Sequence, residues 1–170
     1  MPDSLSEFFS NPYVWIVLLT FTPALELRAS IPYGILMARL PWLVVAPMAV
    51  GVNILLGPIV FFGLDKFLHL VLRIGWVHRL WDRFIVRTQK KVHPLVEKYG
   101  VLGLSVFIGV PLPGSGVYSG AVGGYLLGFR KRDFYLSTVL GVLIAAAAVS
   151  IVVLIVQYTG TQALDFFIKR

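Results

Sequence analysis

Two apolar segments of this chain are each interrupted near the middle by residues that end a helix. The first break is at residues 23–28 (PALELR) and the second at residues 111–116 (PLPGSG). Hydrocarbon cannot hydrogen-bond the N–H and C=O groups that a broken helix frees, so such backbone lies inside protein or lines a wet cavity. The two breaks therefore predict a functional site at membrane depth.

The composition is that of an integral membrane protein. Of the 170 residues 58% are hydrophobic and 14% are charged, and the mean hydropathy is +0.84, well outside the ordinary soluble range. Residues 41–64 and 134–164 carry no charge, and each run exceeds the roughly 20 residues that cross a bilayer. We expect one membrane domain over residues 1–170. The chain has no cysteine, which excludes thiolate metal sites and a cysteine nucleophile.

The same order of segments occurs twice along the chain. Pro23 precedes Pro111 by almost the same number of residues as Gly34 precedes Gly123. This offset predicts an internal repeat, although chance matches in an apolar chain rich in glycine and proline are the alternative. The expected units are repeat 1 at about residues 8–64, a basic connector at residues 66–98, and repeat 2 at about residues 99–158.

The basic residues indicate how the second interrupted segment, residues 99–129, lies in the membrane. Eight of the fifteen Lys and Arg residues lie between residues 66 and 98, and three more lie at residues 130–132. Lys and Arg in short loops favour the cytoplasmic side, and both clusters share that side only if the segment enters the membrane and returns. Its arms, at about 1.5 Å per residue, reach roughly the midplane.

The predicted fold is an all-α membrane protein with two re-entrant helical hairpins and two or three transmembrane helices in an inverted repeat. Hairpins that enter from opposite faces bring their breaks together near the membrane centre, as in inverted-repeat transporters. Both termini are then outside. The connector is expected to be an amphipathic cytoplasmic element with its basic face toward anionic lipid. Topology thus accounts for the net charge of +7, and we expect no nucleic-acid partner.

The first break carries two charges, Glu26 and Arg28. A charge at the bilayer centre costs from about 2.5 to more than 10 kcal/mol, so it is rarely present without a partner or a function. One interpretation is an ion pair that fixes a non-helical turn between Pro23 and Pro32. In the other, Glu26 binds a proton or cation and Arg28 binds an anionic group of a substrate. The two interpretations are compatible.

The second break has no charge, but it leaves several backbone N–H and C=O groups without helical hydrogen bonds. Pro111 and Pro113 cannot complete a helical ladder, and Gly114 and Gly116 adopt conformations closed to other residues. Ser115 is a candidate N-cap for a half-helix that follows it, whose N-terminal dipole would point at the site. The alternative for such small residues is close helix packing.

One polar residue lies inside the first intact span. Asn53 could contribute to the site or form an interhelical hydrogen bond. The three histidines, His69, His78 and His93, are not at metal-ligand spacing, and we expect no metal and no cofactor.

The residues around the two breaks resemble a known family. Residues 26–34 (ELRASIPYG) and 109–116 (GVPLPGSG) are similar to the small multidrug export proteins, relatives of the DedA and VTT membrane proteins. The resemblance implies a prokaryotic plasma-membrane protein with two opposed re-entrant hairpins, in a superfamily linked to moving lipids or lipid-linked phosphate carriers and to proton-dependent drug tolerance. By this resemblance Glu26 and Arg28 are the acidic residue and the arginine of the first hairpin, and residues 111–116 are the turn of the second.

The chain departs from DedA proteins at one point. Those proteins carry an arginine in the second hairpin, whereas no Lys or Arg lies between Lys98 and Arg130 here. The resemblance therefore does not imply a phosphate substrate that is held from both hairpins.

These features predict an ion-gradient-coupled transporter or flippase for a small amphipathic or lipid-like substrate. No nucleotide-binding motif is visible, so the driving force would be a gradient of H⁺ or Na⁺. A passive lipid scramblase or channel is the alternative. An intramembrane enzyme is not expected, because Ser115 has no histidine in either hairpin to activate it. The expected partners are membrane lipids, the substrate, the ion and a second copy in a homodimer.

Overall fold

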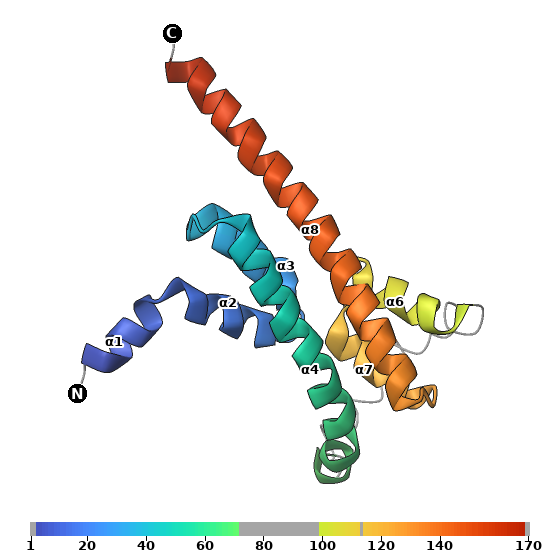
Figure 1. Cartoon of the computed structure of the whole chain (residues 1–170). Coiled ribbons are helices and arrows are strands. Elements are labelled where there is room, and N and C mark those ends of the chain that lie inside the picture. The colour runs from blue at the N-terminus through green and yellow to red at the C-terminus, as the bar shows by residue number, and fades with distance from the viewer. Residues whose placement is uncertain (1–2, 72–98, 113, 169–170) are drawn as a thin grey trace.

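The described part of the chain is helical throughout. The computed structural model describes residues 3–71, 99–112 and 114–168, and no strand occurs among them. In chain order the helices are α1 (Asp3–Ser10), α2 (Pro12–Phe21), α3 (Glu26–Pro32), the π-helical turn η1 (Tyr33–Met37), α4 (Trp42–Val71), α6 (Val101–Gly109), α7 (Val117–Leu126) and α8 (Lys131–Ile168) (Figure 1).

Two of the described helices, α4 and α8, are long and apolar enough to cross a membrane. The candidate spans are Trp42–Leu64, with 23 residues, and Lys131–Gly160, with 30 residues. They cover most of the two uncharged runs that predict two spans, and both helices continue further, to Val71 and Ile168. Residues 66–71 of the expected connector extend α4, and the rest of it lies outside the described residues.

Each interrupted apolar segment consists of two short helices separated by a break. Helix α2 packs against α3, α6 packs against α7, and α6 also has an extensive contact with α8. In Figure 1, α3 lies beside α4 while α6 and α7 lie against the lower half of α8. The short helices are thus held by the two long ones.

The first break is shorter than the expected turn between Pro23 and Pro32. The chain is helical from Glu26 onward, so residues 26–28 of the expected break belong to α3 and the non-helical turn ends before Glu26. Pro32 lies inside the helical segment, and the π-helical turn η1 follows it directly. A proline has no N–H to donate to the helical hydrogen-bond pattern. The wider π-helical turn accommodates the missing bond.

Glycines permit the closest contacts among the helices that surround the second break. A Cβ on Gly141 of α8 would lie 2.6 Å from Cβ of Ile108 and 2.8 Å from the carbonyl oxygen of Ser105. On α7, Gly120 meets the same Ile108 side chain and Gly124 meets Phe134. Small residues at such positions let membrane helices approach closely.

Replacing Gly141 by alanine is expected to destabilise the protein by about 2 kcal/mol, because one neighbour is backbone that cannot move aside. The measurement is the free energy of unfolding in detergent micelles. Gly160→Ala is the matched control on the same helix, since nothing lies within 4 Å of a Cβ there. Equal effects of the two substitutions would contradict the close α6–α8 contact.

Candidate functional site

The carboxylate of Glu26 caps the N-terminus of α7, a helix in the other half of the chain. It accepts hydrogen bonds from the backbone N–H groups of Val117, at 3.1 Å, and Tyr118, at 3.3 Å. These are the first two residues of α7, whose N–H groups have no partner within their own helix. Glu26 is only 3% exposed. The helix dipole at this end also favours the negative charge.

The guanidinium of Arg28 binds the end of the preceding helix. It donates through Nη1 to the carbonyls of Leu112 (2.7 Å) and Ser115 (3.0 Å) and through Nη2 to those of Val110 (3.1 Å) and Ile108 (3.4 Å), and also to the Ser115 hydroxyl (3.0 Å). Helix α6 ends at Gly109, so the positive charge lies where its dipole is negative.

Glu26 and Arg28 are thus satisfied mainly by the second broken segment. The two charges lie close enough to interact electrostatically, but their hydrogen bonds go to opposite half-helices, α7 and α6. The contacts therefore differ from an ion pair that fixes only the first turn. Because the bonds join residues about 90 positions apart in sequence, they tie the two breaks together.

Ser115 has a different role from the predicted N-cap. The N-cap of α7 is Gly116, which has no side-chain capping bond. The Ser115 hydroxyl lies 2.6 Å from the carbonyl of Val110 and 2.8 Å from that of Leu112, and it accepts a bond from Arg28. The N-cap prediction is wrong because the Glu26 carboxylate occupies the helix end that a local serine would otherwise cap.

Gly116 allows the carboxylate to approach. Its φ is +116°, a conformation that L side chains rarely adopt, and a Cβ there would lie 2.6 Å from Oε2 of Glu26. Gly114 also has a positive φ, +81°, but nothing lies within 4 Å of its Cβ position. Pro111 and Gly114 are exposed, whereas Ser115 and Gly116 are buried. Pro113 lies outside the described residues.

A third contact between the broken segments was not expected from the sequence. The hydroxyl of Tyr118 donates to the carbonyl of Phe21, the last residue of α2. The only sequence feature that could have indicated this contact is the tyrosine itself, which stands just after the glycine-rich break among apolar and small residues. Nearby, the hydroxyls of Thr20 and Ser30 bond at 2.8 Å and fasten α2 to α3.

Two predicted site residues stand apart from this network of hydrogen bonds. Pro32 ends α3, nearly two turns beyond Glu26, and is half-buried. Asn53 of α4 is fully buried, and neither atom of its side-chain amide has a hydrogen-bond partner among the described groups. Among the residues that the structure describes, no interhelical hydrogen bond to Asn53 is seen.

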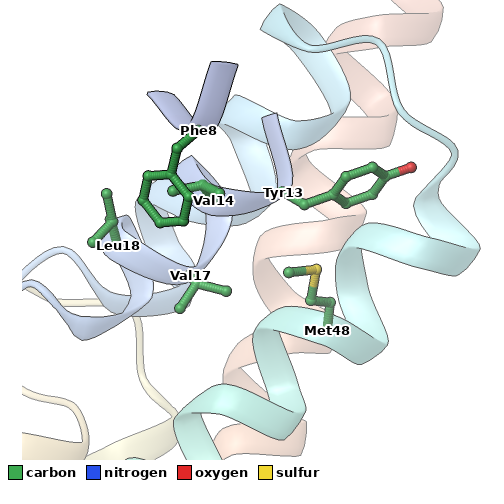
Figure 2. A pocket seen from close by; sticks show the side chains of 6 residues that line it. All are labelled: Phe8, Tyr13, Val14, Val17, Leu18 and Met48. Carbon is green, nitrogen blue, oxygen red and sulfur yellow. The ribbon is translucent and has the colours of Figure 1, made fainter. Parts of the chain in front are cut away.

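A separate cavity of about 320 Å³ lies between the N-terminal helices and α4. Phe8 of α1, Met48 of α4 and four residues of α2 line it, namely Tyr13, Val14, Val17 and Leu18. Figure 2 shows Val17 and Met48 facing each other across it. It contains none of the predicted site residues and no charged side chain. This cavity therefore lies apart from the polar contacts at the two breaks.

The comparison with protein families identifies the chain. Residues 26–148, well over half of its length, match the family described as "Putative small multi-drug export protein". The comparisons with curated proteins and with solved structures gave no match. The matched region begins at Glu26 and includes the second break, and with α4 and α8 it fits a membrane protein. The chain belongs to the small multidrug export protein family.

Proposed function

We propose that this protein is an ion-gradient-coupled transporter or flippase for a small amphipathic or lipid-like substrate. The substrate site lies near the membrane midplane, between two re-entrant hairpins arranged as an inverted repeat. The observation that carries this proposal is the pair of charges on α3, each bound to the free backbone of the opposite broken segment. The family's name supports export as the activity.

The network is suited to opening and closing because exchangeable hydrogen bonds join the two breaks. In the described conformation the carboxylate of Glu26 and both Nη atoms of Arg28 are bound to other protein groups, whereas Nε of Arg28 has no partner among the described groups. We take this conformation as a closed state. Opening frees the Arg28 guanidinium, the carbonyls from Ile108 to Ser115, and the N–H groups at the start of α7. The polar part of a substrate binds these groups in place of their protein partners, and its apolar part stays in lipid.

Ion coupling acts through Glu26. An ionised carboxylate is held by two N–H groups and by the positive end of α7. Binding of a cation or proton neutralises this charge and weakens the hold, since hydrogen bonds to charged groups are stronger than those to neutral ones. The ion thus shifts the population toward the open state by its differential affinity.

The remaining elements of the proposal concern the surroundings of the site. The protein lies in a prokaryotic plasma membrane with the connector in the cytoplasm and both termini outside, and it acts as a homodimer related to DedA and VTT proteins. It performs no covalent chemistry, and its partners are membrane lipids, the substrate and H⁺ or Na⁺.

A passive scramblase is the second candidate. Pro111, Leu112 and Gly114 of the second break are exposed. A break with one exposed side offers a polar path for lipid head groups without any coupled opening.

Replacing Glu26 by glutamine is expected to abolish the dependence of transport on a pH gradient. Glutamine keeps the size of the side chain but cannot be ionised. The assay follows a fluorescent phosphatidylglycerol in proteoliposomes, with and without a pH gradient. Glu7→Gln, at an exposed position, is the matched control and should behave like the natural protein.

The same assay separates the two candidates. A coupled transporter moves the probe faster under the gradient, and this acceleration disappears in Glu26→Gln. A scramblase equilibrates the probe at one rate in the natural protein with or without the gradient, which would contradict the coupled mechanism.

A further inference from the structure

The second break presents two adjacent binding positions of opposite polarity. Carbonyl oxygens at the end of α6 and in the turn after it gather around the Nη atoms of Arg28, at 2.7–3.4 Å. The N–H groups at the start of α7 bind the carboxylate of Glu26. The carbonyl position lies at the negative end of a helix dipole and the N–H position at a positive end. One therefore suits a cation and the other an anion.

The two positions are next to each other along the chain. Gly116 alone separates the carbonyl of Ser115 from the N–H of Val117, and two residues of extended chain span at most about 7 Å. Leu112, whose carbonyl is another of the acceptors, is exposed, so the turn is accessible from one side. A single small head group whose charges are equally close together can therefore reach both positions.

A pair of side chains with no net charge fills both positions in the described conformation. Glu26 and Arg28 carry opposite charges and lie two residues apart on α3. A purely anionic or purely cationic ligand would add an unpaired charge at membrane depth, which is costly. A zwitterionic ligand replaces both side chains and keeps the net charge of the site at zero.

The carbonyl position also discriminates among cations. Four carbonyls and the Ser115 hydroxyl bond with Arg28 through Nη1 and Nη2, whereas Nε has no partner among the described groups. The position thus uses only the N–H donors at the tip of the guanidinium. A primary ammonium supplies three such donors in a compact group. A quaternary ammonium has none and would leave the carbonyls unpaired.

The carboxylate that fills the anion position is held by a strained segment. Glu26 has a φ of +48° and Ala24 a φ of +70°, both in the left-handed region that residues with a Cβ seldom adopt. The hydrogen bonds from α7 compensate for this strain in the described conformation. A ligand that binds those N–H groups in place of Glu26 allows the first break to relax.

We propose that the substrate is a zwitterionic amphiphile whose cationic group carries N–H donors and lies close to its anionic group, as in a phosphoethanolamine head group. The ammonium replaces Arg28 among the carbonyls of the second break, and the phosphate replaces Glu26 at the N-terminus of α7. The apolar chain stays in lipid. The inference rests on the proposed function, since it requires that the breaks open, and it names the substrate class.

The test is solid-state NMR of the full-length natural protein in phosphatidylcholine bilayers, which offer no N–H donor. Protein arginine is labelled with ¹⁵N and serine with ¹³C at the carbonyl, and the Ser115 signal is assigned by its loss in Ser115→Ala. Lysophosphatidylethanolamine is expected to abolish the dipolar coupling between the Arg28 guanidinium and the Ser115 carbonyl, whose oxygen lies 3.0 Å from Nη1. When its own ammonium carries the ¹⁵N label, a coupling from this nitrogen to Ser115 should appear.

Lysophosphatidylcholine and lysophosphatidylglycerol with the same acyl chain are the matched probes. The first lacks N–H donors on its cation, and the second has only the anion. Each should need at least about tenfold more probe for the same loss of coupling, which corresponds to about one charge-assisted hydrogen bond. Equal responses to all three probes, or no response to lysophosphatidylethanolamine, would overturn the inference.

Glycerophosphoethanolamine, the same head group without a chain, distinguishes a soluble zwitterion from a lipid-like one. It should also be at least about tenfold weaker, and a response equal to that of lysophosphatidylethanolamine would contradict the assignment to an amphiphile. If lysophosphatidylethanolamine displaces Arg28 but transport ignores the pH gradient, the proposed function fails while the substrate class stands. If the gradient accelerates transport but this probe leaves Arg28 in place, the substrate class is wrong and the proposed function stands.

Discussion

Replacing Arg28 by glutamine is expected to lower the free energy of unfolding by roughly 3–5 kcal/mol. The guanidinium serves four backbone carbonyls and one hydroxyl of the second break. Glutamine is shorter and has a single N–H₂ group, so most of these charge-assisted hydrogen bonds are lost, and a hydrogen bond to a charged group contributes about 1.5–3 kcal/mol. The positive charge at the end of α6 is lost as well.

Reversible unfolding in mixed micelles measures this effect. Arg132→Gln is the control, since Arg132 is exposed in the first turn of α8 and should change stability by less than about 0.5 kcal/mol. Arg28→Lys should fall between the two, because lysine keeps the charge without the planar fork that serves several acceptors. A loss below about 1 kcal/mol in Arg28→Gln would show that the carbonyls do not depend on this side chain.

The second large effect is expected for Gly116→Ala, at about 3–4 kcal/mol. Two causes act together. The backbone conformation, with φ of +116°, is strained for any residue with a Cβ, at a cost of about 1–3 kcal/mol. The new methyl group would also lie 2.6 Å from Oε2 of Glu26, so the carboxylate must leave the N-terminus of α7 or the turn must move.

Gly114→Ala separates these two causes. Gly114 has a positive φ of +81° but open space at its Cβ position, so its substitution adds strain without the clash. We expect about half the loss of stability seen for Gly116→Ala in the same unfolding experiment. A Gly114→Ala loss as large as that of Gly116→Ala would mean that strain alone explains the effect, and that Glu26 does not lie against the turn.

The breaks and the spans could be predicted because their causes are local. Pro23 and Pro111 interrupt apolar runs where neither water nor a helical ladder can satisfy the backbone, and the uncharged runs match the candidate spans of α4 and α8. The burial of Glu26 was also predictable, since a charge inside an apolar segment must find a partner. The family followed from the residues around the two breaks and is shown by the match over residues 26–148.

The partners of the charges could not be predicted, because they come from the distant half of the chain. A serine before a helix is usually its N-cap, but Gly116 follows Ser115 in an extended, positive-φ conformation, and Glu26 reaches the helix end instead. Pro32 was expected among the site residues, but it is the last residue of α3, six residues after the helix begins. Nothing in the sequence indicates that the amide of Asn53 is buried without a hydrogen-bond partner among the described groups.

The central claim is that the first break holds the second through Arg28 and Glu26. Solid-state NMR in lipid bilayers tests it with ¹⁵N-labelled arginine and serine labelled with ¹³C at the carbonyl. The account predicts dipolar coupling between the Arg28 guanidinium and the Ser115 carbonyl, whose oxygen lies 3.0 Å from Nη1, and its loss in Arg28→Lys. No coupling in the natural protein would contradict the account.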